Sequence, residues 1–141
     1  MKYIILLTFF CTLVSLVFCG LQSVKIYGKL RCGNEKAKNI KVKLYDEDTG
    51  PDPDDLMAEN KTDKNGYFEL TGASSEIGKI EPRLKIYHNC NDGWAPGKRK
   101  FTFEIPKKYI SEGQTPIHSI NLGELNLEVK IPHEEDRDCI N

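Results

Sequence analysis

The strongest constraint on the fold is a short-range alternation of apolar and polar side chains that recurs along most of the chain. In "IKVKLY", residues 40–45, the apolar residues are Ile40, Val42 and Leu44. The same alternation gives apolar positions at Val24, Ile26, Leu30, Phe68, Leu70, Leu84, Ile86, Phe101, Phe103 and Ile105. Because successive side chains of a strand point to opposite faces, each segment predicts a strand with one buried face. Several such strands predict an all-β sandwich.

Turn-forming clusters separate the predicted strands, at residues 46–55, 62–66 and 91–97. Asn65-Gly66 predicts a tight hairpin, because both residue types tolerate positive φ. No segment shows a sustained helical periodicity of apolar residues. Residues 106–113 are expected to form one helical turn after Pro106. Without an internal repeat or a long linker, the sequence predicts one compact domain.

The phase of the alternation changes near the end of this domain. Gly123-Glu124 stands between two runs of apolar positions, Ile120 and Leu122 before it and Leu125, Leu127, Val129 and Ile131 after it. A shift by one residue is what a β-bulge produces. A turn that joins two short strands is the alternative.

The first residues are typical of a secretory signal peptide. Met1-Lys2 is a short positive region, Ile4 to Phe18 is an apolar core, and the small residues Cys19 and Gly20 follow. We therefore expect a signal peptide at 1–20, cleaved after Cys19 or Gly20, a sandwich domain at 21–131 and a short tail at 132–141. An uncleaved signal anchor is the alternative. The expected location is secreted and extracellular.

The charge balance argues against nucleic acid as a partner. Of 20 basic and 21 acidic side chains only Lys2 lies in the expected signal peptide, so the remaining chain has a formal net charge of −2. Such a chain offers no bulk attraction to a polyanion.

The stretch "IYHNCNDG", residues 86–93, places His88 two residues before Cys90. A cysteine nucleophile needs a base within hydrogen-bond reach, yet residues i and i+2 of a strand have Cβ atoms about 7 Å apart. A zinc site needs three or four ligands, and the other histidines, His118 and His133, are distant in sequence. We therefore expect no catalytic residue, no metal and no cofactor, and assign Cys90 to a structural disulfide.

Three of the five cysteines remain after the expected signal peptide: Cys32, Cys90 and Cys139. In an oxidising compartment three cysteines predict one disulfide and one odd thiol. The sequence alone leaves the pairing open.

The acidic turn at 46–55 has two interpretations. Six carboxylates fall within it, at Asp46, Glu47, Asp48, Asp52, Asp54 and Asp55. Clustered carboxylates suit calcium, but the EF-hand pattern is missing and two prolines stiffen the turn. A solvated turn is the favoured interpretation.

Two loop features offer candidate surface sites. Asn60-Lys61-Thr62 is an N-glycosylation sequon, and its place before the turn at 62–66 predicts exposure of Asn60. Trp94 would be a contact anchor if exposed; we expect it instead to fold back over the end of the core.

Four stretches resemble the transthyretin-like family of secreted nematode proteins. They are "GKLRCGNEKAKNIKVKLYDEDTGPDPDDLM", "KTDKNGYFELTG", "IEPRLKIYHNCNDG" and "RDCIN", and they occur in the family's order. The resemblance implies a transthyretin-like Greek-key β-sandwich of seven to eight strands. That topology places Cys32 and Cys90 at one end, which favours their pairing, and brings the tail with Cys139 to the same end. Many members have a further cysteine where this chain has Gly97, so their pairing cannot be carried over intact.

The implied topology also makes three lysine-bearing strands neighbours. Their outward positions carry Lys41, Lys43, Lys85 and Lys100, with Lys98 nearby. Lysines on one face of adjacent strands can bind an anionic lipid surface, at about 1 kcal/mol each. Alternatively they only keep the face soluble and discourage aggregation.

The resemblance implies a non-enzymatic extracellular protein that recognises a protein or lipid partner through its surface. The alternatives are an adapter for anionic phospholipid on dying cells and a carrier of small apolar ligands. The same fold hosts hydroxyisourate hydrolases, which end in Tyr-Arg-Gly-Ser; this chain ends Asp138-Cys139-Ile140-Asn141. The sequence leaves the partner, the disulfide connectivity, the occupancy of Asn60 and the oligomeric state open.

Overall fold

A computed structural model describes residues 19–47, 53–130 and 135–139 of the chain. The strands are β1 (Cys19–Cys32), β2 (Glu35–Lys36), β3 (Lys41–Asp46), β4 (Asp55–Lys61), β5 (Tyr67–Ile77), β6 (Pro82–His88), β7 (Lys98–Glu104), β8 (Ser111–Glu112), β9 (Ser119–Asn126) and β10 (Glu135–Asp138). A 3-10 turn, η1 (Lys107–Tyr109), follows Pro106 as predicted. Seven of the described strands have six residues or more, so the all-β prediction is confirmed.

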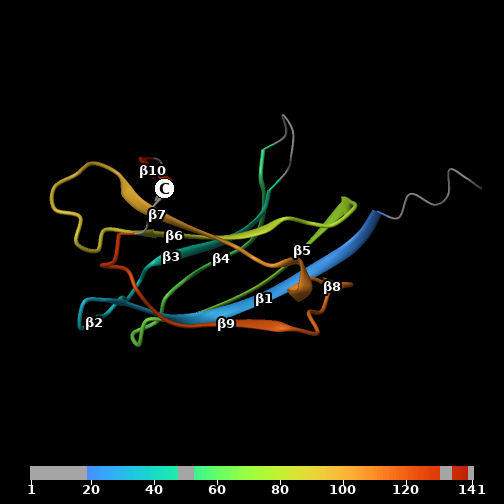
Figure 1. Cartoon of the computed structure of the whole chain (residues 1–141), viewed down its shortest axis with the longest axis horizontal. Helices are drawn as coiled ribbons and strands as arrows, with labels where there is room; N and C mark the ends of the chain where they lie inside the picture. The colour runs from blue at the N-terminus through green and yellow to red at the C-terminus, as the bar shows by residue number, and fades with distance from the viewer. Residues whose placement is uncertain (1–18, 48–52, 131–134, 140–141) are drawn as a thin grey trace, which may run out of the picture.

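The strands form two layers, which Figure 1 shows one above the other. In one sheet β1 pairs with β5 on one side and with both β8 and β9 on the other. The short strand β2 pairs with the last two residues of β1. The other sheet has the order β10-β7-β6-β3-β4. After β4 the chain crosses to the first sheet as β5 and returns as β6 beside β3, which is a Greek-key connection. Only β9 pairs in parallel, with β1, among the described strand pairs.

The core lies between the two sheets, and the predicted alternation supplies most of it. Buried apolar side chains include Val24, Ile26, Leu30, Val42, Leu44, Phe68, Leu70, Leu84, Ile86, Ile105, Ile120 and Leu127. Phe101 and Phe103 have the predicted phase but are only half-buried against this core. The described part of the chain contains no helix that is long and apolar enough to cross a membrane.

The phase change near Gly123 is a β-bulge, as predicted. Tyr27 faces Asn121 and Lys29 faces Glu124, so that two residues of β9 lie opposite Gly28 alone. Gly123 has φ of 68°, the left-handed conformation that glycine adopts without strain. The alternative of two strands joined by a turn is excluded, because β9 continues from Ser119 to Asn126.

The predicted inward phase is wrong at Val129. The strand ends at Asn126, and a turn follows in which the Val129 N–H donates to the Asn126 carbonyl (3.3 Å). The turn leaves Leu127 buried but Val129 59% exposed. Ile131 lies outside the described residues.

Asn65-Gly66 forms a turn, but the predicted hairpin is wrong. The Gly66 N–H donates to the Asp63 carbonyl (3.0 Å), and the Gly66 carbonyl accepts the Leu30 N–H (2.8 Å). The strands on either side, β4 and β5, belong to different sheets. Turn chemistry reverses the chain, but the partner of the next strand is chosen by tertiary packing.

Gly66→Ala should lower the free energy of unfolding by about 1–3 kcal/mol, because Gly66 has φ of 75° and an added Cβ would lie 2.2 Å from the Leu30 carbonyl oxygen. Urea denaturation measures this loss. Gly78→Ala is the matched control, since φ there is also positive but an added Cβ meets nothing within 4 Å. Equal losses in the two variants would contradict the proposed clash with Leu30.

Candidate functional site

The Cys32–Cys90 disulfide joins the two sheets at one end of the sandwich. Cys32 is the last residue of β1 and Cys90 follows β6, with their Cα atoms 5.7 Å apart. This is the pairing that the resemblance favoured. Cys139 is exposed and not disulfide-bonded.

His88 is buried and supports the disulfide turn. Its ring is buried, and Nδ1 accepts the backbone N–H of Cys90 (3.2 Å). Cys90 itself is oxidised, so the pair contains no thiol nucleophile. Within the described ranges, no group of three His, Cys, Asp or Glu side chains could hold a metal ion.

The segment after Cys90, residues 91–97, is here called the Trp94 loop. Trp94 is fully exposed, so the expectation that it folds back over the core is wrong. The end of the core beneath the loop is already occupied, because the buried Arg99 guanidinium donates to the carbonyls of Cys90 (2.8 Å) and Leu127 (3.1 Å). Arg99 therefore covers the backbone at this end of the core, while the Trp94 side chain stays in solvent.

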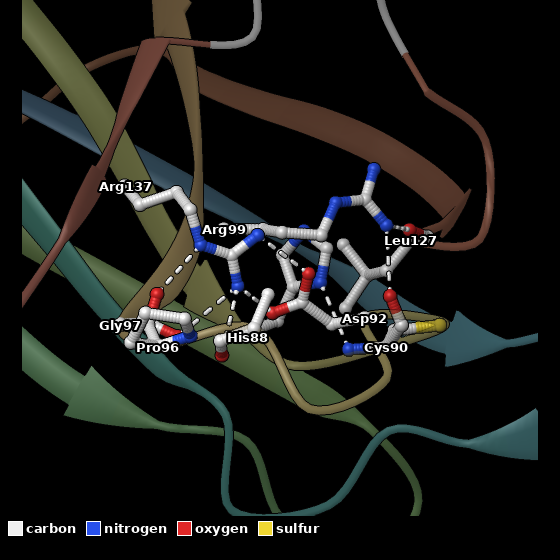
Figure 2. Close-up of polar contacts among 9 residues, drawn as sticks. His88, Cys90, Asp92, Pro96, Gly97, Arg99, Leu127 and Arg137 are labelled. Atoms are coloured by element: carbon white, nitrogen blue, oxygen red, sulfur yellow. Dashed lines mark hydrogen bonds and ion pairs between the residues drawn. The ribbon is translucent and has the colours of Figure 1, made fainter.

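Arg137 holds the Trp94 loop from the outside. Figure 2 shows its guanidinium facing Asp92 and the carbonyls of the loop. Nη1 and Nη2 bind the Asp92 carboxylate in a bidentate pair, the first at 2.8 Å, and Nε donates to the Pro96 carbonyl (2.7 Å). Nη2 also donates to the carbonyls of Ala95 (3.2 Å) and Gly97 (3.3 Å).

This contact, here called the Arg137 clasp, joins the C-terminal segment to the loop. The strand that carries Arg137, β10, pairs with β7 directly after the loop, with Asp138 opposite Lys98. The hydrogen bonds from Arg137 hold the pKa of the Asp92 carboxyl below its usual value. Sequence reasoning missed both Arg137 and Arg99, because an arginine that binds backbone carbonyls leaves no spacing pattern to recognise.

The predicted lysines lie on neighbouring strands, but with carboxylates among them. Lys43 and Lys85 face each other across β3 and β6, and Lys41 and Lys100 lie on either side of Tyr87. Glu59 lies 3.9 Å from Lys41 and 3.6 Å from Lys43.

The inner lysines are also packed against aromatic rings. Lys85 pairs with Asp54 (2.7 Å) and lies 4.6 Å from the centre of the Tyr45 ring. Lys43 is buried between Tyr45 and Tyr87, at 5.8 and 5.6 Å from the ring centres. This face is therefore a packed network of ion pairs and rings, and the outward position of Lys43 does not expose it.

Asn60 is exposed on the edge strand β4, as predicted. Its Nδ2 donates to the Glu69 carbonyl (3.3 Å). The sequon threonine has a separate structural use, because the buried Thr62 hydroxyl donates to the Ala37 carbonyl (2.6 Å) and accepts the Ile40 N–H (2.8 Å). Glycosylation of Asn60 stays a prediction.

Three carboxylates of the acidic turn bind partners within the protein. Asp46 is buried and accepts the Glu81 N–H (2.8 Å), Glu47 pairs with Arg83, and Asp54 pairs with Lys85. Asp55 begins β4 with an exposed side chain. Asp48 and Asp52 lie outside the described residues.

Replacement of both Cys32 and Cys90 by serine should lower the free energy of unfolding by about 4 kcal/mol, because the disulfide closes a loop with a sequence separation of 58. Denaturant titration measures the change. Cys139→Ser is the control and should unfold as the wild type does. Peptide mapping that finds Cys90 joined to Cys139 would contradict the structure.

The Arg137 clasp should weaken in acid. Because the folded pKa of Asp92 is lowered, its contribution to stability is fully present above the unfolded pKa and is lost as pH falls through the lower, folded value. Asp92→Asn should therefore be less stable than the wild type at neutral pH, and the difference should close as the pH falls toward about 2. Urea midpoints across this range test the prediction, with the exposed Asp55→Asn as control. A difference that does not depend on pH would contradict it.

Comparison with known proteins places this architecture in a family. The sequence model of the Transthyretin-like family matches residues 27–106. Transthyretin-like protein 33 of Caenorhabditis elegans is 49% identical over 119 residues, which cover 84% of this chain and 82% of that protein. Transthyretin-like proteins 5 and 2 of the same organism are 45% and 41% identical, each over 99% of both chains. The chain belongs to the transthyretin-like family.

Proposed function

We propose that this protein is a secreted, non-enzymatic binding protein that recognises an extracellular protein partner through the Trp94 loop. The observation that carries the proposal is a fully exposed tryptophan in a loop that is held at both ends. Tryptophan is among the residues that contribute most to protein interfaces. Members of this family are expected to be extracellular, which is where such a partner would be met.

The Trp94 loop is preorganised for binding. A flexible loop loses conformational entropy when a partner orders it, whereas a loop already ordered avoids that loss. Here the disulfide fixes the start of the loop, and Arg137 binds four of its seven residues. Trp94 itself is left outside these contacts, with its whole ring surface open to a partner.

The lysine face supports an anionic-lipid adapter less well. Lys41, Lys43 and Lys85 each have a carboxylate within 4 Å, and Lys43 is buried. Lipid phosphates would have to compete with these ion pairs for the lysines. The binding free energy per lysine would then be smaller than the value of about 1 kcal/mol that holds for unpaired lysines. The proposal therefore places the contact at the Trp94 loop.

Trp94→Ala should weaken partner binding at least tenfold, because truncation of an anchoring tryptophan typically removes 2 kcal/mol or more, roughly, of binding free energy. Immobilised wild type and variant would be exposed to extracellular material of a nematode, and captured proteins quantified by mass spectrometry. Purified candidates would then be titrated against both proteins. Ile117→Ala is the matched control, since Ile117 is another large exposed apolar residue, 79% accessible.

Binding to phosphatidylserine vesicles tests the alternative that the protein is a lipid adapter. The triple variant Lys41→Glu/Lys43→Glu/Lys85→Glu, with its fold verified by amide spectra because Lys43 is buried, should leave partner capture unchanged. Strong binding of wild type to the vesicles, lost in the triple variant and kept in Trp94→Ala, would overturn the proposal in favour of a lipid adapter.

A further inference from the structure

A second surface feature lies on the outer face of the sheet formed by β5, β1 and β9, and it shares no residue with the Trp94 loop. It is a shallow hollow of about 230 Å³, here called the tyrosine hollow. Its lining residues are Tyr27, Gly28, Lys29, Tyr67, Asn121 and Gly123. The hollow lies over the β-bulge, where Gly123 has no side chain and an added Cβ would meet nothing within 4 Å.

Two tyrosine rings form its apolar surface. The ring centroids of Tyr27 and Tyr67 lie 6.5 Å apart with their planes inclined at 46°. Both side chains point outward from the sheet and are half-buried. At this separation the two rings pack on each other, so that a ligand cannot be sandwiched between them and would pack on the ring surface that lines the hollow.

The polar groups around the rings are fixed by hydrogen bonds. The Tyr67 hydroxyl donates to Glu69 (2.7 Å), and Glu69 also pairs with Lys25 (2.7 Å). The bond to Glu69 raises the pKa of Tyr67, while Lys25 holds the pKa of Glu69 below its usual value. The Tyr67 hydroxyl therefore stays protonated and directs its O–H toward Glu69, so that its oxygen lone pairs can accept hydrogen bonds from other donors.

The bulge orients a further donor. The Asn121 Oδ1 accepts the Gly123 N–H (2.8 Å), so that the amide presents Nδ2 as its donor group. The Lys29 ammonium at the rim is a second donor. The hollow thus combines an aromatic surface with both acceptors and donors, and the neighbouring carboxylate at Glu69 is already neutralised by Lys25.

We propose that the tyrosine hollow binds one neutral pyranose ring of a glycan. A pyranose has an apolar C–H face that packs on an aromatic ring and a rim of hydroxyls that both donate and accept hydrogen bonds. The hollow is smaller than the roughly 300–1,000 Å³ of drug-sized sites, which fits a single sugar ring. A quaternary ammonium also prefers aromatic surfaces, but it would meet the Lys29 cation here.

The test uses the full secreted chain and three probes, the methyl β-glycosides of glucose, galactose and N-acetylglucosamine. Saturation-transfer NMR detects contact, and amide shifts of the labelled protein locate it. At least one glycoside should bind saturably with a dissociation constant on the order of millimolar, as expected for a ligand of this size. The shifts should centre on Tyr27, Tyr67, Asn121 and Gly123.

Variants separate the tyrosine hollow from the rest of the surface. Tyr27→Leu and Tyr67→Leu should each weaken binding about tenfold or more, because both remove an aromatic face. Tyr67→Phe keeps the ring and should lose less. Tyr45→Leu, on the outer face of the opposite sheet, is the matched control and should bind as wild type does.

Three outcomes would overturn the proposal: no saturable shift with any glycoside, binding unaffected by both leucine variants, or tyrosine-dependent binding of choline chloride without binding of the sugars. Amide spectra of each variant confirm that it is folded, so that a lost fold cannot be mistaken for a lost site. The outcome is independent of Trp94, because Trp94→Ala should leave sugar binding unchanged.

Discussion

The Cys32–Cys90 disulfide is the constraint on which the rest of the structure depends. It joins β1 of one sheet to the turn after β6 of the other, and so fixes both the spacing of the layers and the start of the Trp94 loop. Arg99 and His88 then satisfy the backbone groups that this crowded turn buries. A turn without those partners would leave buried polar groups unpaired, at a cost of about 1–3 kcal/mol for each.

The disulfide and the Arg137 clasp each fix a different part of the Trp94 loop. The disulfide acts on its first residues, and Arg137 acts on Asp92 and on the carbonyls at its far end. The disulfide resists acid, whereas the clasp depends on an ionised carboxylate. The loop is therefore ordered under neutral conditions by contacts that lie apart from Trp94.

The sequence predicts the sandwich well, because burial of one face imposes a period of two on each strand. The bulge at Gly123 was readable for the same reason, since a one-residue slip reverses the buried face. Periodicity says nothing of contacts between distant segments. It could not show that β5 leaves the sheet of β4, that tyrosine rings bury Lys43, or that Arg137 binds the Trp94 loop.

The most direct test of the account is the mobility of the Trp94 loop in solution. Backbone ¹⁵N relaxation would give order parameters for residues 91–97 in wild type and in Arg137→Gln, both at neutral pH. The account predicts values near about 0.85 in the wild type, typical of rigid backbone, and below about 0.6 in the variant. Values already below about 0.6 in the wild type would contradict it, because the loop would then not be ordered in the free protein.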